Sequence, residues 1–171
     1  MRNKYLLYTL TLFFLQLMCA QFAHADSFNS GEVIRVVDGD TIVVKSSNKI
    51  ERIRLIGIDA PEMIDKKSGV AQCYAKKAKE ELSKMVFQKK VRIAPDTKNK
   101  NRDIYGRLLR YVTVDSDKRS PSINELLIQK GAVRLYKRYD FEYLTLFQKQ
   151  EKTARETQLG LWKKTVCSYG K

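Results

Sequence analysis

Residues 32–58 read EVIRVVDGDTIVVKSSNKIERIRLIGI, and this stretch decides the fold class. Its apolar runs at 32–37, 41–45 and 50–58 are rich in Val and Ile, the residues that favour β-strands. Asp38-Gly39 lies between the first two runs, and an Asp-Gly pair in that setting is typical of a β-hairpin. The body of the chain is therefore predicted to begin with a hairpin followed by a third strand.

Helical and strand-like patterns alternate along the rest of the chain. Between residues 70 and 88 the apolar side chains recur with the spacing of one helix face, at Ala75, Ala78, Leu82, Met85 and Val86. A capping-box pattern from Ser122 to Glu125 predicts a second helix that ends at Gly131. The other predicted elements are strands at 91–94 and 105–114, a loop at 96–103, an extended piece at 132–136 and a last helix at 141–159. Together these elements predict a small mixed fold around a closed or partly open β-barrel.

The N-terminal segment, residues 1–25, has the composition of an export signal. Arg2 and Lys4 form a basic start, residues 5–20 are mostly apolar, and Ala23-His24-Ala25 matches a small-x-small cleavage pattern. A retained membrane anchor is the alternative, but the apolar run is shorter than the roughly 20 residues of a spanning helix. We expect cleavage after Ala25, no stable membrane anchor, and one domain over residues 26–171 in a secreted or periplasmic protein.

The composition limits the chemistry of this domain. His24 is the single histidine, so removal of the export segment excludes Ser-His-Asp and Cys-His sites and histidine ligands for zinc. An enzyme of this composition has to use carboxylates and cations, with or without a hard metal ion. The formal net charge of +14 indicates either a generally basic surface or a binding surface for a polyanion. Charge alone does not choose between nucleic acid, anionic lipid and acidic polysaccharide.

Two cysteines remain after export. Cys19 lies inside the export segment, and the bulky Met18 before it disfavours a lipoprotein site. Cys73 and Cys167 form an even pair in an oxidising compartment, which favours a disulfide. Such a bond would join the C-terminal tail to the middle of the chain. Two buried free thiols are the alternative.

Three carboxylates lie close together around the first strands. Asp40 follows the hairpin turn, while Asp59 and Glu62 stand on either side of Ala60-Pro61. Clustered carboxylates without histidine suit a hard divalent cation, which prefers oxygen ligands. Each also has a plain structural explanation, since Asp40 could cap the turn and the other two could be ordinary loop residues. Asp38 is expected to be a turn residue rather than a ligand.

Two arginines sharpen this interpretation. Arg54 interrupts an apolar strand, and Arg107 follows Gly106, although Arg107 could also be a surface cation. Their planar guanidinium groups could hold a phosphate between them. Arg54 and Asp59 are five residues apart, so strict strand alternation would place them on opposite faces. They can meet only if the chain bends before Asp59, and Gly57 is the expected place.

Six short segments resemble the staphylococcal nuclease (thermonuclease) family in their order and spacing. They are 37–41, 54–62, 103–107, 124–127, 130–132 and 160–162, and the similarity extends over about residues 31–162. The resemblance implies an α+β fold with a mainly β core, an OB-type five-stranded barrel with three helices. It also implies a calcium-dependent endonuclease that hydrolyses DNA and RNA and leaves 3′-phosphate ends. We expect such a nuclease to act as a monomer.

The resemblance also assigns a metal site. It implies that the carboxylates of Asp40 and Asp59 and the backbone carbonyl of Ala60 bind Ca²⁺, with Asp38 as a further carboxylate near the metal. Ala60 replaces a threonine of the best-known member of the family. That difference is harmless if only the carbonyl binds.

The implied substrate contacts are Arg54 and Arg107 on the scissile phosphate, Glu62 as general base, Tyr105 beside a terminal phosphate, and Tyr139 as a base-stacking platform. Two positions depart from the best-known member of the family: Ile104 stands in place of a phosphate-contacting lysine, and Lys137 in place of a stacking tyrosine. A non-catalytic nucleic-acid-binding barrel and a basic protein for acidic envelope polymers are the alternatives. Neither requires the carboxylates and arginines together, because binding alone needs only cations and aromatic residues.

Overall fold

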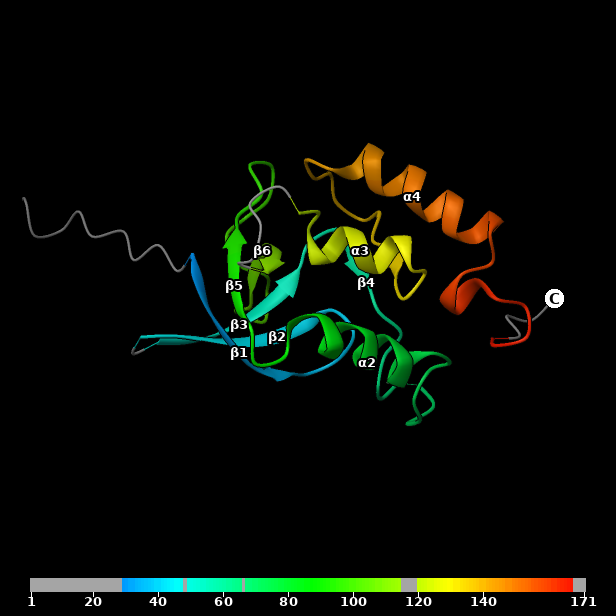
Figure 1. The fold of residues 1–171 in the computed structure, drawn as a ribbon, viewed down its shortest axis with the longest axis horizontal. Coiled ribbons are helices and arrows are strands. Elements are labelled where there is room, and N and C mark those ends of the chain that lie inside the picture. Colours follow the sequence, from blue (N-terminus) through cyan, green and yellow to red (C-terminus); the bar gives the residue numbers. More distant parts are fainter. Residues whose placement is uncertain (1–28, 48, 66, 115–119, 168–171) are drawn as a thin grey trace, which may run out of the picture.

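Five strands close into a barrel in a computed structural model that describes residues 29–47, 49–65, 67–114 and 120–167. Around the barrel the strands follow the order β1-β2-β3-β6-β5 (Figure 1). Their bounds are β1 Ser30–Val36, β2 Thr41–Ser46, β3 Lys49–Leu55, β5 Lys90–Ala94 and β6 Leu108–Val114. The pairing of β3 with β6 is parallel, and the other barrel pairings are antiparallel. The expected export signal lies outside the described residues.

The predicted hairpin is confirmed. β1 pairs with β2 in antiparallel register, with Val36 opposite Ile42, and the N–H of Val37 donates to the carbonyl of Thr41 at 2.9 Å. Alternate side chains of these strands enter the barrel, where Val33, Ile42 and Val44 are fully buried. The turn that carries Asp38-Gly39 therefore joins two strands of the core.

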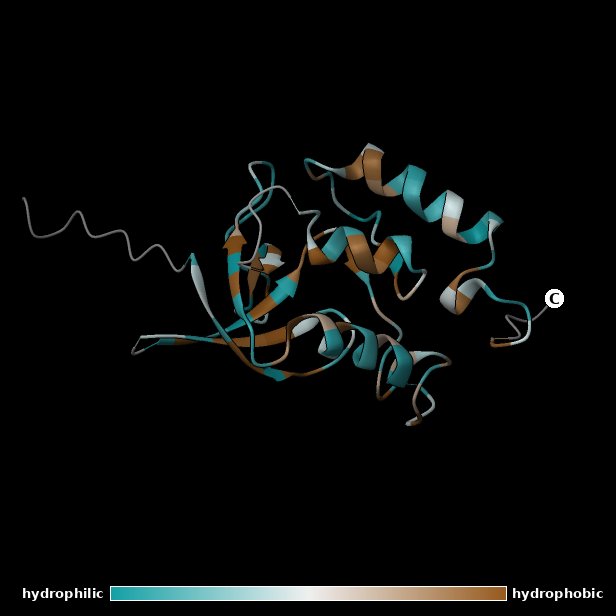
Figure 2. Ribbon diagram, in the orientation of Figure 1, coloured by the Kyte–Doolittle hydropathy of each residue, from teal (hydrophilic) through white to brown (hydrophobic). Residues whose placement is uncertain are grey.

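Three α-helices lie to one side of the barrel among the described residues (Figure 1): α2 Ala75–Val86, α3 Ile123–Gln129 and α4 Leu144–Glu156. α3 packs against β6 and α2 and also against α4, so α4 forms an outer layer (Figure 1). Figure 2 shows hydrophobic residues along β2 and α3, the elements that face the core. A 3-10 turn, η1 Gly160–Trp162, follows α4, and β4 Ile58–Asp59 pairs with β7 Arg134–Leu135 in a separate two-stranded sheet. This architecture confirms the expected α+β fold with an OB-type barrel. Within the described residues, no helix has the length and apolar character needed to cross a membrane.

Several predicted boundaries are wrong, among them the start of the last helix at Leu144 rather than at 141 and the end of the third strand at Leu55 rather than at 58. Three further differences have a local reason. The first helix begins at Ala75 rather than at residue 70, because Tyr74 adopts a left-handed conformation with φ 73°. Strand β6, the last strand of the barrel in the sequence, begins at Leu108 rather than at 105, because Gly106 has φ 77° and belongs to a turn. The last helix ends at Glu156 rather than at 159, because Gln158 has φ 54° and cannot continue it.

A buried asparagine fixes α3 against the barrel. The side chain of Asn124 is fully buried, and its Oδ1 accepts from the N–H of Val112 at 3.0 Å. Its Nδ2 donates to the carbonyls of Ile56 at 2.9 Å and Arg110 at 3.2 Å. These bonds satisfy backbone groups in the core and hold the chain in place just before Gly57.

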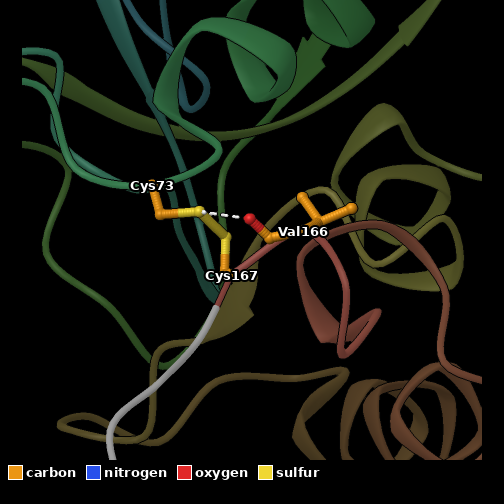
Figure 3. The surroundings of a disulfide bond; sticks show 3 residues. All are labelled: Cys73, Val166 and Cys167. Atoms are coloured by element: carbon orange, nitrogen blue, oxygen red, sulfur yellow. Dashed lines mark hydrogen bonds between the residues drawn. A yellow bond between two sulfur atoms is a disulfide. The ribbon is translucent and has the colours of Figure 1, made fainter.

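A disulfide joins Cys73 to Cys167 across 94 residues of sequence, with the two Cα atoms 5.8 Å apart (Figure 3). The Sγ of Cys73 also lies 3.2 Å from the carbonyl oxygen of Val166. A sulfur in a disulfide has no hydrogen to donate, so this is a close contact rather than a hydrogen bond. The bond ties the segment before α2 to the chain that follows η1.

Candidate active site

A bend at Gly57 brings Arg54 and Asp59 together. β3 ends at Leu55 and β4 begins at Ile58, and between them Gly57 has φ 77°, a conformation that favours glycine. The Nη1 of Arg54 donates to the carbonyls of Leu55 at 3.0 Å and Ile58 at 2.8 Å. Its Nη2 donates to Asp59 Oδ1 at 3.3 Å. The bend expected at Gly57 is therefore present, and it removes the conflict with strand alternation.

Asp40 is the buried acid of the site. Its Oδ2 accepts from the N–H of Ala60 at 2.8 Å and lies 3.2 Å from Nη1 of Arg54. Its Oδ1 accepts from the hydroxyl of Thr41 at 3.0 Å. Burial raises the pKa of Asp40 to about 7, an effect that the charge of Arg54 opposes and that of Asp38 reinforces. The carboxyl of Asp40 therefore binds a proton more readily than an exposed aspartate does.

Asp38 acts as a turn residue, as its position predicts. Its Oδ1 accepts from the backbone N–H of Asp40 at 3.1 Å, the two-residue pattern by which aspartates close turns. This bond fixes the backbone of Asp40 and places a second carboxylate beside it.

Arg107 is held in place by Asp103 and Thr41. Its Nε donates to Asp103 Oδ2 at 2.7 Å, its backbone N–H donates to Oδ1 at 2.9 Å, and its Nη1 donates to the hydroxyl of Thr41 at 3.3 Å. Burial raises the pKa of Asp103, but the hydrogen bonds and charge of Arg107 outweigh it and lower that pKa overall. Thr41 also donates to Asp40, so its hydroxyl links Arg107 to the buried acid.

The sequence interpretation missed the roles of Thr41 and Asp103. Thr41 stands opposite Arg54 in the register of β2 and β3, so strand pairing was the signal that could have placed it. Asp103 precedes Arg107 by four residues across the Gly106 turn, and its function depends on the conformation of that turn.

We call Asp40, Thr41, Arg54, Asp59 and Arg107 the barrel cluster.

Glu62 lies outside the hydrogen bonds of the barrel cluster. It follows Ala60 by two residues, and its side chain is exposed. Its backbone N–H donates to Oε1 of Gln72 at 3.0 Å, and its carbonyl accepts from the N–H of Gln72 at 2.9 Å. Within the described part of the chain its carboxylate forms no hydrogen bond or ion pair, so its oxygens are free to accept.

The two predicted aromatic contacts occupy different surroundings. Tyr105 is 66% exposed, and the guanidinium of Arg107 lies 5.4 Å from its ring centroid. Tyr139 is 62% exposed and its ring centroid lies 6.0 Å from that of Tyr136. The structure thus joins Tyr105 to the barrel cluster, whereas the ring of Tyr139 lies beside a second tyrosine.

The donor atoms available for a metal are oxygens. The described residues contain no group of three acidic, histidine or cysteine side chains placed to hold an ion. Asp40 and Asp59 do approach the same guanidinium, and Ala60, whose N–H bonds Asp40, adds a backbone carbonyl to the local donors. Two carboxylates and a carbonyl are oxygen donors of the kind that a hard cation such as Ca²⁺ prefers.

Comparisons with known proteins identify the family of the chain. Residues 52–164 match the family described as staphylococcal nuclease homologue. A thermonuclease of Staphylococcus hyicus is 33% identical over 132 residues, covering 77% of this chain and 74% of that protein. A micrococcal nuclease of Shigella flexneri is 34% identical over 137 residues, covering 77% and 72%. An uncharacterized endonuclease of Escherichia coli O157:H7 is 33% identical over 160 residues, covering 94% and 90%. The chain therefore belongs to the staphylococcal nuclease family of phosphodiester-hydrolysing nucleases.

Proposed function

We propose that this protein is an exported, calcium-dependent nuclease that hydrolyses DNA and RNA to products with 3′-phosphate ends. The observation that carries the proposal is the convergence of Arg54 and Arg107 on Asp40 and Thr41, beside the carboxylate of Asp59. The two guanidinium groups supply a phosphate-binding half of the active site, and the two carboxylates beside them supply a cation-binding half. Nucleic acid is the substrate class that the names of the relatives support.

Asp40, Asp59 and the carbonyl of Ala60 would hold the calcium ion. When bound, the ion supplies positive charge to a phosphate oxygen and orients the scissile group. Asp40 would serve in this role from a buried position, with its carboxylate oxygens fixed by the N–H of Ala60 and the hydroxyl of Thr41. Asp38 adds negative charge at the same place and keeps the backbone of Asp40 fixed.

Arg54 and Arg107 would bind the scissile phosphate and stabilise the charge that builds on its equatorial oxygens. Asp103 occupies Nε of Arg107, which leaves Nη2 without a hydrogen bond in the described part of the chain. Arg54 is fixed by two carbonyls and Asp59, so its orientation is set before substrate arrives. Preorganised donors of this kind lose little freedom on binding.

Glu62 would act as the general base. Its free carboxylate accepts a proton from water, the water oxygen forms a bond to phosphorus, and the bond from phosphorus to the 5′ oxygen breaks. The phosphate then stays on the 3′ side, and the 5′ oxygen leaves as a hydroxyl by taking a proton from solvent, to which Glu62 returns the proton it accepted. Tyr105 would contact a terminal phosphate, and the exposed ring of Tyr139 would stack on a base.

Hydrolysis of single-stranded DNA by the chain from residue 26 onwards tests this function. The assay compares calcium, magnesium and a chelator and identifies the end groups of the products. Calcium-dependent cleavage with 3′-phosphate ends is the expected result. Cleavage with magnesium alone would refute the calcium assignment, and tight salt-sensitive binding without cleavage would favour a nucleic-acid-binding module.

Export and the monomeric state belong to the same proposal. Residues 1–25 support a secreted or periplasmic location, because they combine a basic start, an apolar run and a small-x-small site. N-terminal sequencing of the exported protein should find Asp26 as the first residue. Light scattering of that protein should give the mass of one chain.

A further inference from the structure

Gln72 uses all of its hydrogen-bonding side-chain atoms, and its backbone N–H as well, to close one loop. Its N–H donates to the carbonyl of Glu62 at 2.9 Å, and its Oε1 accepts from the N–H of Glu62 at 3.0 Å. Its Nε2 donates to Asp65 Oδ2 at 2.6 Å. One residue therefore holds the backbone of Glu62 from both sides, while the Glu62 carboxylate itself is left free.

Asp65 supports this arrangement from within the loop. Its Oδ1 accepts from the N–H groups of Lys67 and Ser68, each at 2.9 Å, and its own N–H donates to the carbonyl of Val70 at 2.9 Å. The hydrogen bond from the Ser68 N–H, followed by that from Gln72, lowers the pKa of Asp65 to about 2. The acceptor for Gln72 is therefore ionised at any pH at which the protein would work.

The next residue after Gln72 is covalently anchored. Cys73 forms the disulfide with Cys167, which is 6% exposed and lies beyond η1 (Figure 3). Cys73 itself is an exposed residue, whereas its partner is buried. Tyr74 then turns through a left-handed conformation into α2. The loop that carries Glu62 is thus fastened to the C-terminal segment through one bond adjacent to Gln72.

We propose that Gln72 is a positioning residue for Glu62, and that the Cys73–Cys167 disulfide anchors it so that turnover falls when the disulfide is reduced. This inference rests on the proposed function, in which Glu62 is the general base. A dithiol reductant supplies two electrons and two protons. The S–S bond then breaks, both cysteines become thiols, and the reductant becomes a disulfide. The residue next to Gln72, Cys73, then loses its covalent link to the C-terminal segment, and Glu62 spends less time in the orientation that accepts the proton from water.

Substitution of Gln72 tests the positioning role. We expect Gln72→Ala to lower kcat by about 10- to 100-fold, part of the roughly 10²- to 10⁴-fold that a placed general base contributes. KM should stay within about twofold, because the arginines that bind phosphate are untouched. Gln148→Ala, which removes an exposed glutamine of α4, is the matched control and should leave kcat unchanged.

A double exchange provides a rescue that a merely structural role would not predict. Gln72→Glu keeps an acceptor for the N–H of Glu62 but sets a negative charge against Asp65. Adding Asp65→Asn gives position 65 a side-chain N–H that can donate to the new carboxylate at position 72. The hydrogen bond between the two side chains is then restored with donor and acceptor exchanged. We expect Gln72→Glu to lower kcat and the double variant to recover most of it. Equal rates for wild type and Gln72→Ala, or no recovery in the double variant, would overturn the proposal.

Reduction tests the anchor on the intact protein. We expect a dithiol to lower kcat of the wild type to that of Cys73→Ser/Cys167→Ser, and the double variant to be insensitive to the dithiol. Amide hydrogen exchange at Glu62 should be faster in the reduced wild type and in the double cysteine variant than in the oxidised wild type. Exchange in β2 and β3 should not change. Equal loss of protection in β2 and β3 would make the disulfide a general stability element and overturn the proposal. A wild type that never cleaves would refute the proposed function instead, while exchange at Glu62 would still report on the anchor.

Discussion

The barrel cluster and the Glu62 loop, residues 62–65 and 67–72, are built by different means. The side chains of Asp40 and Arg54 are 8% and 13% exposed. Their partners lie in β2, β3 and β4 and at Ala60, directly after β4. Glu62 is exposed and is held through its backbone by one glutamine and, next to it, a disulfide. A site on packed strands is fixed by the core, whereas a site on a loop needs its own fastening. The phosphate-binding half is thus expected to tolerate perturbation better than the half that accepts the proton.

Glu62→Gln removes the function of the loop and should leave the barrel cluster intact. We expect kcat to fall by about 10²- to 10⁴-fold, because glutamine cannot accept the proton from water. Affinity for single-stranded DNA should change little, since the arginines and the metal ligands remain. Steady-state kinetics together with fluorescence anisotropy separate the two effects. Loss of affinity alongside activity would place Glu62 in binding rather than in proton transfer.

Arg107→Lys tests the barrel side of the comparison. Lysine keeps the charge but cannot satisfy Asp103 and a phosphate with one planar group. We expect kcat/KM to fall by about 10- to 100-fold, since a hydrogen bond between charged groups contributes roughly 1.5–3 kcal/mol. Arg52→Lys makes the same exchange at an exposed position of β3 and should have no effect. Wild-type kinetics for Arg107→Lys would remove Arg107 from the site.

Local patterns predict most of what builds the barrel cluster. The apolar alternation in 32–58 predicts the hairpin and β3, and the five-residue spacing of Arg54 and Asp59 leads to the bend at Gly57. These features depend on neighbours in sequence or on a single glycine. The hairpin, the third strand and the place of the bend can therefore be predicted from local patterns, whereas the OB-type barrel follows from the family resemblance and the meeting of Arg54 with Asp59 depended on a bend that only the structure shows.

The contacts that the sequence did not predict depend on chain segments that meet only in the fold. The hydroxyl of Thr41 links Asp40 to Arg107, which lies 66 residues further along the chain, and no pattern in the sequence near Thr41 predicts this contact. Gln72 sits in a polar loop without periodicity, so its hold on Glu62 has no pattern to reveal it. The late start of α2 has the same origin, because the left-handed Tyr74 follows the anchored Cys73.

The pH dependence of calcium binding probes the charge of the barrel cluster. Because the pKa of Asp40 is raised to about 7, protons compete with calcium at and below that pH. We expect affinity measured by calorimetry to fall by up to about tenfold from pH 7 to pH 6, the limit for one competing proton.

Without metal, the free energy of unfolding depends on pH with the opposite sign. A raised pKa in the folded state stabilises the protein below about pH 4, and this stabilisation is lost as pH rises through about 7. Asp40→Asn should flatten that dependence in thermal unfolding, and a pH-independent calcium affinity would contradict the assignment of Asp40.

Ile104→Lys should have the smallest effect. It tests whether the turn next to the barrel cluster faces the substrate. Ile104 is 91% exposed in the turn beside Tyr105 and Arg107, so a lysine there meets no steric obstacle. The added charge should lower KM by about two- to fivefold at low salt, because one more phosphate is neutralised, and the gain should vanish as salt rises. Gln148→Lys adds the same charge on α4 and separates a local contact from a general increase in attraction. If both variants lower KM equally, the turn at 103–107 does not face the substrate, and the contact between Tyr105 and Arg107 only stabilises the turn.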